Sequence, residues 1–250
     1  RLVGSEMCIR DRDGTRVIAD LSVKYGTRKF VMVSTDKAVN PTNVMGCSKR
    51  ICEIYVQSLD QAIKDGKVRG RTQFVTTRFG NVLGSNGSVI PLFKEQIKRG
   101  GPVTVTHKDI IRFFMLIPEA CKLVLEAGTM GNGGEIFVFD MGKPVRIVDL
   151  AERMIRLSGV KGIEIRFTGL RDGEKLYEEV LNEEETSKPT FHPKIKIAQV
   201  RAYDYADANL RIDALVRACV VEGDMQIVKR MKEIVPEFKS QHSKYEVLDK

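Results

Sequence analysis

The chain has 250 residues, of which 42% are hydrophobic, so it can bury a sizeable core in one or two domains. No apolar run approaches the roughly 20 residues that a membrane-spanning helix requires, which predicts no membrane contact by this chain. The net charge of +8 comes from basic residues spread among acidic ones, without a nucleic-acid-binding motif. We therefore expect a site for an anionic ligand and no nucleic-acid partner.

Residues 30–34, FVMVS, form a short apolar run that predicts a fully buried strand of a parallel sheet. Thr35, Asp36 and Lys37 follow at the carboxyl end of this strand. Ligands of open α/β sheets bind outside the carboxyl ends of the strands, so this hydroxyl, carboxylate and amine can meet a substrate together. Taken alone, polar residues after a strand are more often only a strand end.

A helix is predicted from residue 44 onward, after Asn40-Pro41-Thr42 interrupts the chain. Either Thr42 or Asn43 can cap it. Met45 and Lys49 lie four residues apart and share one side of its first turns. A packed thioether beside a solvated amine is the commoner outcome of such spacing. The expected buried face consists of Val44, Ile51, Ile54, Tyr55 and Leu59.

Further downstream, strands and helices alternate, which indicates an α/β architecture. We expect a buried strand over 72–81 that ends at Asn81, a turn at 85–87, a helix from Ser88 to the Gly100-Gly101-Pro102 break, a strand at 103–106, a helix at 117–128, a strand at 135–140 and a helix over 145–159. Residues 182–193 mix charges with prolines and predict a mobile loop. The tail after Pro236 is polar and predicts nothing specific.

The three histidines, His107, His192 and His242, are scattered along the chain. The five cysteines are odd in number and form no C-x-x-C pair, which favours a reduced, cytoplasmic setting. No metal site is predicted.

Residues 34–50, STDKAVNPTNVMGCSKR, resemble the extended short-chain dehydrogenase/reductases. Within them the segment is similar to nucleotide-sugar 4,6-dehydratases, in which a Thr-Asp-Lys or Thr-Asp-Glu triplet follows a strand and a Tyr-x-x-x-Lys helix comes next. It looks like the CapD-type UDP-N-acetylglucosamine 4,6-dehydratases of polysaccharide biosynthesis, where Met occupies the usual tyrosine position. The similarity continues through residues 78–107, 111–128 and 170–181.

The resemblance implies an internal redox cycle on a UDP-sugar. The C4 hydroxyl is oxidised by NAD, water leaves across C5 and C6, and the hydride returns to C6. Asp36 would protonate the departing C6 hydroxyl, Lys37 would act as the base at C5, and Thr35 would hydrogen-bond the C4 oxygen. A thioether cannot titrate, so Met45 leaves the base for the C4 hydroxyl open between Asp36 and an ordered water.

The same resemblance implies the binding residues. Lys49 would hold the nicotinamide ribose, with Ser34 as a second cofactor contact. Asn81, Ser88 and Val89 would contact the nucleotide, although a turn and helix cap explains them almost equally well. Arg171 and Arg112 would grip the diphosphate, because guanidinium groups bind phosphate oxygens bidentately, and Glu174 would complete this set. The alternative for Arg112 is a charge on an edge strand.

The chain contains no G-x-G-x-x-G after a first strand, so it lacks the loop that cradles a dinucleotide pyrophosphate. The family places that loop upstream of the Ser-Thr-Asp-Lys strand, and we therefore expect a carboxyl-terminal fragment that is inactive alone. Residues 1–12, RLVGSEMCIRDR, do not resemble the family and are expected to be a foreign or artefactual leader. A divergent natural helix is the alternative.

The predicted fold class is α/β: a partial Rossmann-like domain, with a doubly wound parallel sheet that lacks its amino-terminal half, and a smaller α/β substrate-binding region. Residues 13–85 would be the carboxyl-terminal part of the NAD-binding domain, 86–235 mostly the nucleotide-sugar region with a return to the Rossmann sheet, and 236–250 a polar tail. The full-length protein is expected to be a homo-oligomer. The resemblance also implies amino-terminal helices that anchor it to the inner membrane.

Two rival functions remain open at this point. One is a nucleotide-sugar epimerase or reductase of the same fold, which would not need an acid and base pair at Asp36 and Lys37. The other is a non-catalytic binding or assembly module, which the missing glycine loop favours.

Overall fold

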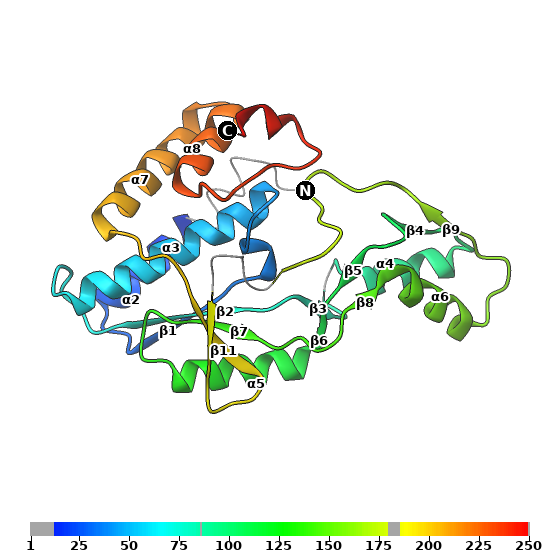
Figure 1. Cartoon of the computed structure of the whole chain (residues 1–250), viewed down its shortest axis with the longest axis horizontal. Coiled ribbons are helices and arrows are strands. Elements are labelled where there is room, and N and C mark those ends of the chain that lie inside the picture. Colours follow the sequence, from blue (N-terminus) through cyan, green and yellow to red (C-terminus); the bar gives the residue numbers. More distant parts are fainter. Residues whose placement is uncertain (1–12, 86, 180–185, 250) are drawn as a thin grey trace.

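A five-stranded sheet forms the centre of the computed structural model, which describes residues 13–85, 87–179 and 186–249 (Figure 1). Its strand order is β1 (Lys29–Val33), β2 (Gln73–Arg78), β7 (Ile136–Phe139), β11 (Ile195–Gln199) and β10 (Thr186–Pro189). The first three strands are parallel, and β11 and β10 run antiparallel to their neighbours. The sheet therefore takes strands from both sides of residue 85.

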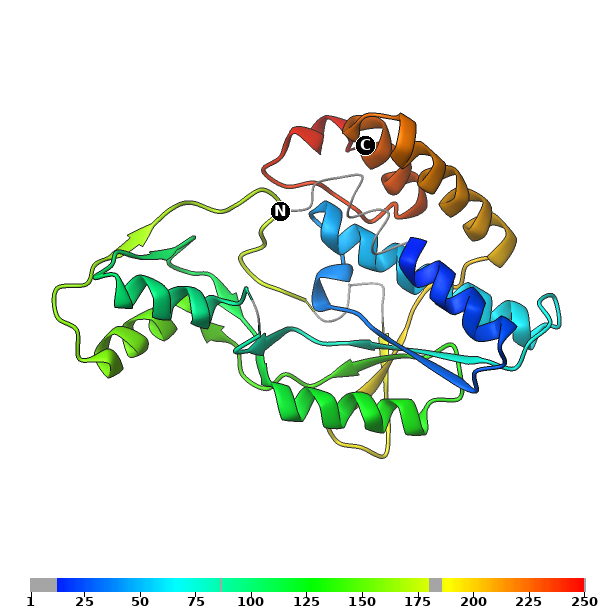
Figure 2. The same cartoon turned by 180° about the vertical axis from the view of Figure 1, so that it is seen from behind.

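Helices cover both faces of this sheet (Figures 1 and 2). One face carries α2 (Gly14–Lys24), α3 (Val44–Lys64), α7 (Tyr205–Val221) and α8 (Asp224–Ile234), and the opposite face carries α5 (Ile117–Met130). Separate apolar clusters fill the two layers. The predicted α/β class, with a parallel sheet wound on both faces, is confirmed.

A smaller α/β region extends from one end of the sheet. Its elements are α4 (Val89–Lys98), α6 (Ile147–Ser158), the parallel pair β4 (Val103–Val105) and β9 (Ile165–Phe167), and the antiparallel pair β5 (Ile111–Arg112) and β8 (Val145–Arg146). The parallel pair β3 (Asn81–Leu83) and β6 (Phe114–Leu116) connects this region to the sheet. It has its own apolar core around Phe93 and Ile110.

Helix α3 follows the predicted pattern closely. Asn43, not Thr42, is its cap, and the Asn43 side chain accepts a hydrogen bond from the Gly46 backbone N–H at 2.9 Å. The Thr42 hydroxyl donates instead to the Gly173 carbonyl at 2.8 Å. Of the predicted buried face, Ile51, Ile54, Tyr55 and Leu59 are buried, and Val44 is half-buried.

Strand β1 differs from its predicted environment. It lies at the edge of the sheet, and β2 is its only strand partner among the described residues. Met32 is buried, but Val33 is 51% exposed. An apolar run of this length does not distinguish a central strand from an edge strand, so the prediction of full burial was wrong.

Two other local predictions need correction. The strand predicted over 72–81 ends at Arg78, and Asn81 begins the separate strand β3. Thr186–Pro189 form strand β10 within the predicted loop, because they pair with β11, whereas residues 182–185 lie outside the described part.

The predicted leader at residues 1–12 lies outside the described part, as does residue 86 of the turn predicted at 85–87. Across this turn the Ser88 backbone N–H donates to the Ser85 carbonyl at 3.1 Å.

Residues 236–249, predicted to be an uninformative tail, fold back along α8 and end in a short helix, η3 (Lys244–Leu248). Ser243 caps η3 in a capping box with Glu246. The backbone N–H groups of Lys239 and Gln241 donate to the carbonyls of Pro41 and Thr42. This segment, called the carboxyl-terminal segment below, is therefore joined to the residues that precede α3.

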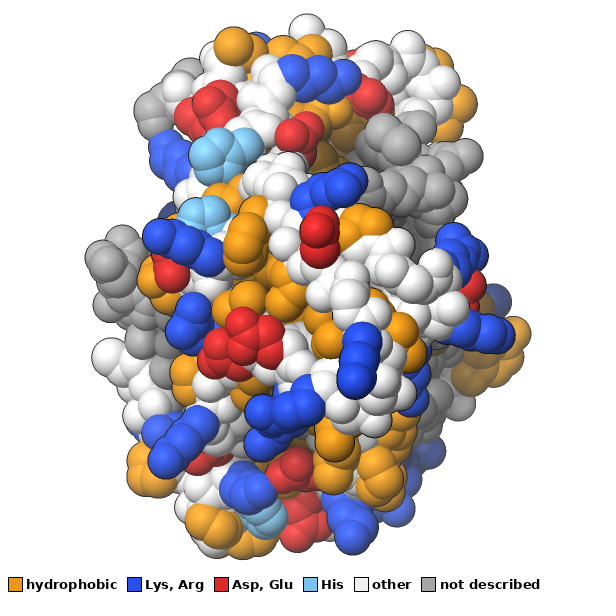
Figure 3. Space-filling view, turned by 90° about the vertical axis from the view of Figure 1, so that its right-hand side faces the viewer, with side chains coloured by type: hydrophobic (Ala, Val, Ile, Leu, Met, Phe, Trp, Pro, Cys, Tyr) orange, Lys and Arg blue, Asp and Glu red, His pale blue; other side chains and the backbone are white. Residues whose placement is uncertain are grey.

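No helix within the described ranges is long and apolar enough to cross a membrane. Figure 3 shows the end of the molecule that carries the smaller region, where basic side chains are dispersed among acidic and apolar ones. On this face they form no continuous basic stripe.

Candidate active site

The predicted triplet Thr35-Asp36-Lys37 forms a tight turn after β1, with the 3-10 helix η2 (Asp36–Ala38) at its centre. Thr35 caps η2 by accepting a hydrogen bond from the Lys37 backbone N–H. Asp36 is fully buried, and its Oδ1 accepts hydrogen bonds from the Thr35 hydroxyl at 2.9 Å and from Lys37 Nζ at 3.0 Å. The three polar groups are thus joined within one turn.

Two glycines make room for this turn. A Cβ at Gly46, in the first turn of α3, would lie 2.1 Å from the Lys37 carbonyl oxygen. A Cβ at Gly80, just after β2, would lie 2.8 Å from Asp36 Oδ2. Because real Cβ atoms do not approach other atoms so closely, both positions need glycine for the backbone to pack against the triplet.

Lys37 connects the triplet to two other parts of the chain. Its Nζ lies 3.1 Å from Asn81 Oδ1 at the start of β3 and 3.7 Å from Glu178 Oε1. The amide oxygen of Asn81, a predicted nucleotide contact, thus accepts a hydrogen bond from Lys37, the candidate base. The ammonium group is surrounded by three oxygen atoms from separate segments.

Glu178 is a site residue that the sequence analysis missed. Its side chain is 4% exposed, and its Oε1 also lies 3.6 Å from Arg112 Nε. Burial raises the pKa of Glu178, and the charge of Asp36 adds to this effect, while Lys37, Arg112 and Lys175 oppose it. In the sequence it is one of two adjacent glutamates, and nothing in that pair distinguishes it from the exposed Glu179.

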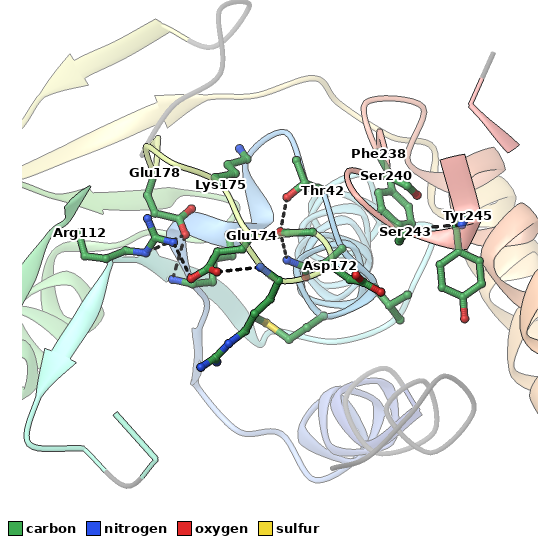
Figure 4. Close-up of a pocket in the computed structure, with 16 residues that line it drawn as sticks. Thr42, Arg112, Asp172, Glu174, Lys175, Glu178, Phe238, Ser240, Ser243 and Tyr245 are labelled. Carbon is green, nitrogen blue, oxygen red and sulfur yellow. Dashed lines mark hydrogen bonds and ion pairs between the residues drawn. The ribbon is translucent and has the colours of Figure 1, made fainter. Parts of the chain in front are cut away.

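The two predicted arginines occupy different environments. Arg112 is 8% exposed and donates from Nη1 to the carbonyls of Ile111 at 2.7 Å and Leu176 at 3.2 Å. Its Nη2 lies 3.5 Å from Glu174 Oε1. Arg171 is exposed, and its backbone N–H donates to Glu174 Oε2 at 3.1 Å. Glu174 thus bridges the two predicted diphosphate residues (Figure 4).

Two neighbouring cavities are lined by predicted site residues. The first has a volume of about 860 Å³ and the second about 530 Å³. Both are lined by Lys37, Met45, Arg112, Arg171 and Glu174. The second is also lined by Asn81, Ser88 and Val89, so the structure brings together every predicted substrate residue. The Ser88 hydroxyl is buried and has no hydrogen-bond partner among the described residues, which leaves it able to bind a ligand.

The carboxyl-terminal segment forms a further wall of the first cavity. Figure 4 shows Phe238, Ser240, Ser243 and Tyr245 on the opposite side of this cavity from Arg112 and Glu178. Gly173 joins the two sides, because its backbone N–H donates to the Gln241 carbonyl at 2.6 Å. Sequence periodicity carried no signal for this contact, since it depends on where a polar segment folds back.

Met45 and Lys49 line different cavities. Met45 lines both substrate-side cavities, whereas Lys49 lines a third cavity of about 290 Å³ beside β1 and the start of α2. Although both lie on one side of α3, Met45 therefore lies beside the Lys37 end of the site and Lys49 beside the edge strand β1.

Ser34, the second predicted cofactor residue, is 5% exposed and donates its hydroxyl to Glu53 Oε1 at 2.7 Å. Glu53 also accepts hydrogen bonds from Arg78 and Arg50. Burial alone would raise the pKa of Glu53, but the two arginines outweigh it and hold that pKa below its usual range. The Ser34 hydroxyl therefore donates its hydrogen bond within the protein, to Glu53.

Within the described ranges, no group of His, Cys, Asp and Glu side chains could hold a metal ion. For NAD, the position of Lys49 is compatible with the predicted role, because it lines a cavity along β1 with Phe30, Val31, Met32 and Val33. The Ser34 hydroxyl cannot donate a hydrogen bond to NAD while it donates to Glu53.

Comparison with known proteins identifies the family. The profile of a family described as polysaccharide biosynthesis protein matches residues 6–200. Capsular polysaccharide biosynthesis protein CapD of Staphylococcus aureus is 52% identical over 219 residues, which cover 87% of this chain and 36% of CapD. A UDP-glucose 4-epimerase of Rickettsia rickettsii (strain Sheila Smith) is 38% identical over 177 residues, which cover 70% of this chain and 50% of the epimerase. The chain spans half or less of the length of these relatives.

A solved structure supports the same grouping. The X-ray structure of Pen from Bacillus thuringiensis matches 81% of this chain and 67% of that chain, with 31% identity and a TM-score of 0.69. The chain belongs to the polysaccharide biosynthesis protein family, as a CapD-type member of the extended short-chain dehydrogenase/reductases.

Proposed function

We propose that this chain carries the catalytic residues of a nucleotide-sugar dehydratase that converts UDP-N-acetylglucosamine into a UDP-4-keto-6-deoxy-N-acetylhexosamine. The observation that carries the proposal is the contact of 3.0 Å between the buried Asp36 Oδ1 and the partly exposed Lys37 Nζ, which lines two cavities together with two arginines. Dehydration requires an acid and a base on neighbouring carbons, and this pair supplies both.

Proton transfers balance within this pair. Lys37 Nζ takes the C5 proton, while the Asp36 O–H bond breaks and its proton joins the departing C6 hydroxyl to form water. Lys37 then holds one extra proton and Asp36 lacks one. Because the two atoms are hydrogen-bonded, the proton can pass directly from nitrogen to oxygen and restore the starting state. The Thr35 hydroxyl, which now donates to Asp36 Oδ1, is the proposed partner of the C4 oxygen.

The remaining site residues would bind and orient the ligands. Arg112 and Arg171 would hold the diphosphate, with Asn81, Ser88 and Val89 along the nucleotide and Glu174 between the arginines. When bound, NAD would supply the reversible oxidation at C4 and reduction at C6. Lys49 would hold its ribose, and Met45 would pack against the reacting ring without exchanging protons.

The test is incubation of a longer protein, extended upstream of residue 13, with UDP-N-acetylglucosamine and NAD. Mass spectrometry should show a product lighter by one water. A product of unchanged mass with inverted C4 would support the second candidate, a nucleotide-sugar 4-epimerase, which the 38% identity to the Rickettsia epimerase favours. Recovery of unchanged substrate would favour the alternative of a non-catalytic binding or assembly module.

The expected division into a cofactor part and a substrate part also belongs to this proposal, as do a cytoplasmic location, amino-terminal membrane anchoring and homo-oligomerisation of the full-length protein. Their support is the resemblance to longer CapD-type proteins. Gel filtration with light scattering and membrane fractionation of the extended protein test the last two.

A further inference from the structure

Glu178 lies at the point where three segments of the site meet. Its Oε1 is 3.7 Å from Lys37 Nζ on η2 and 3.6 Å from Arg112 Nε on β5, and Glu178 itself follows the turn at 170–174 (Figure 4). The proposed chemistry uses Lys37, and the proposed diphosphate site uses Arg112. Glu178 therefore connects the reacting end of the site to its anion-binding end.

Glu178 has an incompletely satisfied carboxyl group. Its Oε2 is buried and has no hydrogen-bond partner among the described residues, and the same holds for Asp36 Oδ2. A buried charged oxygen without a partner is costly, and protonation removes that cost. The free carboxyl oxygen is thus a position where a proton can be added.

The pKa of Glu178 reflects opposing effects of burial and of its charged neighbours. Burial and the charge of Asp36 raise the pKa of this carboxyl group, while Lys37, Arg112 and Lys175 lower it. An anion bound to Arg112 would offset one of these cations and add negative charge beside Glu178. Both effects favour the neutral carboxylic acid.

We propose that Glu178 is a positioning residue that takes up a proton from solvent when the diphosphate of a nucleotide sugar binds Arg112. This inference rests on the proposed function. The proton bonds to a carboxylate oxygen of Glu178, and no bond of the substrate changes. Lys37 then keeps its contacts with Asp36 and Asn81 but loses its ion pair with Glu178. Substrate binding would thus release the Lys37 side chain from one of its three oxygen partners.

Calorimetry of UDP-N-acetylglucosamine binding tests the proposal without any turnover. Its diphosphate is a diester, so the ligand does not titrate near neutral pH. Titrations in buffers of different ionisation enthalpy should show uptake of up to about one proton per ligand, and the apparent affinity should fall as pH rises, by at most about tenfold per pH unit. The Glu178→Gln variant should lose both effects. The Glu179→Gln variant should keep them, because Glu179 is exposed and pairs with Lys175.

The outcomes of these titrations distinguish the inference about Glu178 from the proposed substrate. Binding to the wild-type chain without proton uptake would overturn the inference but leave the proposed substrate intact, even if the Glu178→Gln variant did not fold. Uptake that persists in a folded Glu178→Gln variant would assign the proton elsewhere. Sulfate, a non-titrating anion, serves as a second probe. Proton-linked sulfate binding that is lost in Glu178→Gln, without nucleotide-sugar binding, would keep the inference and reject the substrate. Binding of neither probe would overturn both.

Discussion

At the scale of single residues, the site depends on one short turn. In the proposed reaction Asp36 and Lys37, which are adjacent in sequence, act on neighbouring carbons. The turn hydrogen-bonds Lys37 Nζ to Asp36 Oδ1 and to Asn81 Oδ1, and Lys37 lines both substrate-side cavities, whereas Asp36 is fully buried and lines neither. Substitutions of Asp36 and Lys37 should therefore distinguish the loss of the proposed acid from the loss of the proposed base.

The Asp36→Asn variant of the extended protein should lose elimination by about 10²-fold or more, because an amide cannot donate the proton that the C6 hydroxyl needs. Substrate binding should stay nearly unchanged, since the arginines are untouched. Rates measured by mass spectrometry and binding measured by calorimetry check this. Asp65→Asn, an exposed change at the end of α3, is the matched control. Equal rates in both variants would show that Asp36 is only part of a strand end.

The Lys37→Met variant should abolish exchange of the C5 proton with solvent, because the side chain keeps a similar length but has no basic nitrogen. Incubation in deuterated water followed by proton nuclear magnetic resonance of the recovered sugar measures the exchange. Lys67→Met, at an exposed surface position, should exchange normally. Deuterium incorporation by Lys37→Met at the wild-type rate would assign the base to another group.

At the scale of elements, a buried ionic cluster fixes α3 against the sheet. Glu53 on α3 accepts from Arg78 on β2 at 2.6 Å and from Arg50 at 3.0 Å, and also from Ser34 at the end of β1. Arg78 and Glu53 are fully buried. The cluster thus holds together the strand and the helix that carry the candidate catalytic residues.

The Glu53→Gln variant should reduce the free energy of unfolding by about 3–5 kcal/mol, because it removes the buried counter-charge that Arg78 and Arg50 share, although Arg50 keeps its ion pair with Glu237. The pKa of Glu53 is lowered in the folded state, so its contribution is present above the unfolded pKa and is lost as pH falls through the folded value. The difference from wild type should therefore be largest near neutral pH and shrink in acid. Urea unfolding at several pH values measures it. Exposed Glu95→Gln should cost less than about 1 kcal/mol; a similarly small, pH-independent loss for Glu53→Gln would contradict the argument.

At the scale of the whole molecule, the position of β1 bears on the proposed binding of NAD. It is an edge strand among the described residues, and the sequence has no glycine-rich loop to surround a pyrophosphate. Backbone N–H groups of such a loop and a helix amino terminus normally supply that site. An edge strand with an exposed valine also favours association with other chains.

We therefore expect the 250-residue chain to bind NAD weakly and to be inactive alone. Calorimetry with NAD, compared with the extended protein, measures the difference. Dynamic light scattering should show particles of the chain that grow with protein concentration, whereas the extended protein should keep a fixed size. Low-micromolar NAD binding by the chain itself would mean that other residues form the cofactor site.

The sequence by itself determined what depends on local pattern. The strand before Thr35, the helix cap, which is Asn43 of the two candidates, and the helix that carries Met45 and Lys49 follow from neighbouring residues and occur at the predicted positions in the sequence. The α/β class followed from the alternation of strands and helices.

Only the tertiary structure decided which distant groups meet. Glu178 Oε1 comes within 3.7 Å of Lys37 Nζ although 141 residue positions separate the two residues in sequence. The carboxyl-terminal segment lines the same cavity as Thr42. Local propensity also could not place β1 at the sheet edge or direct Ser34 inward to Glu53. The physical reason is that burial and charge pairing depend on the partners that chain folding brings together, and the pattern of neighbouring residues contains no information about those partners.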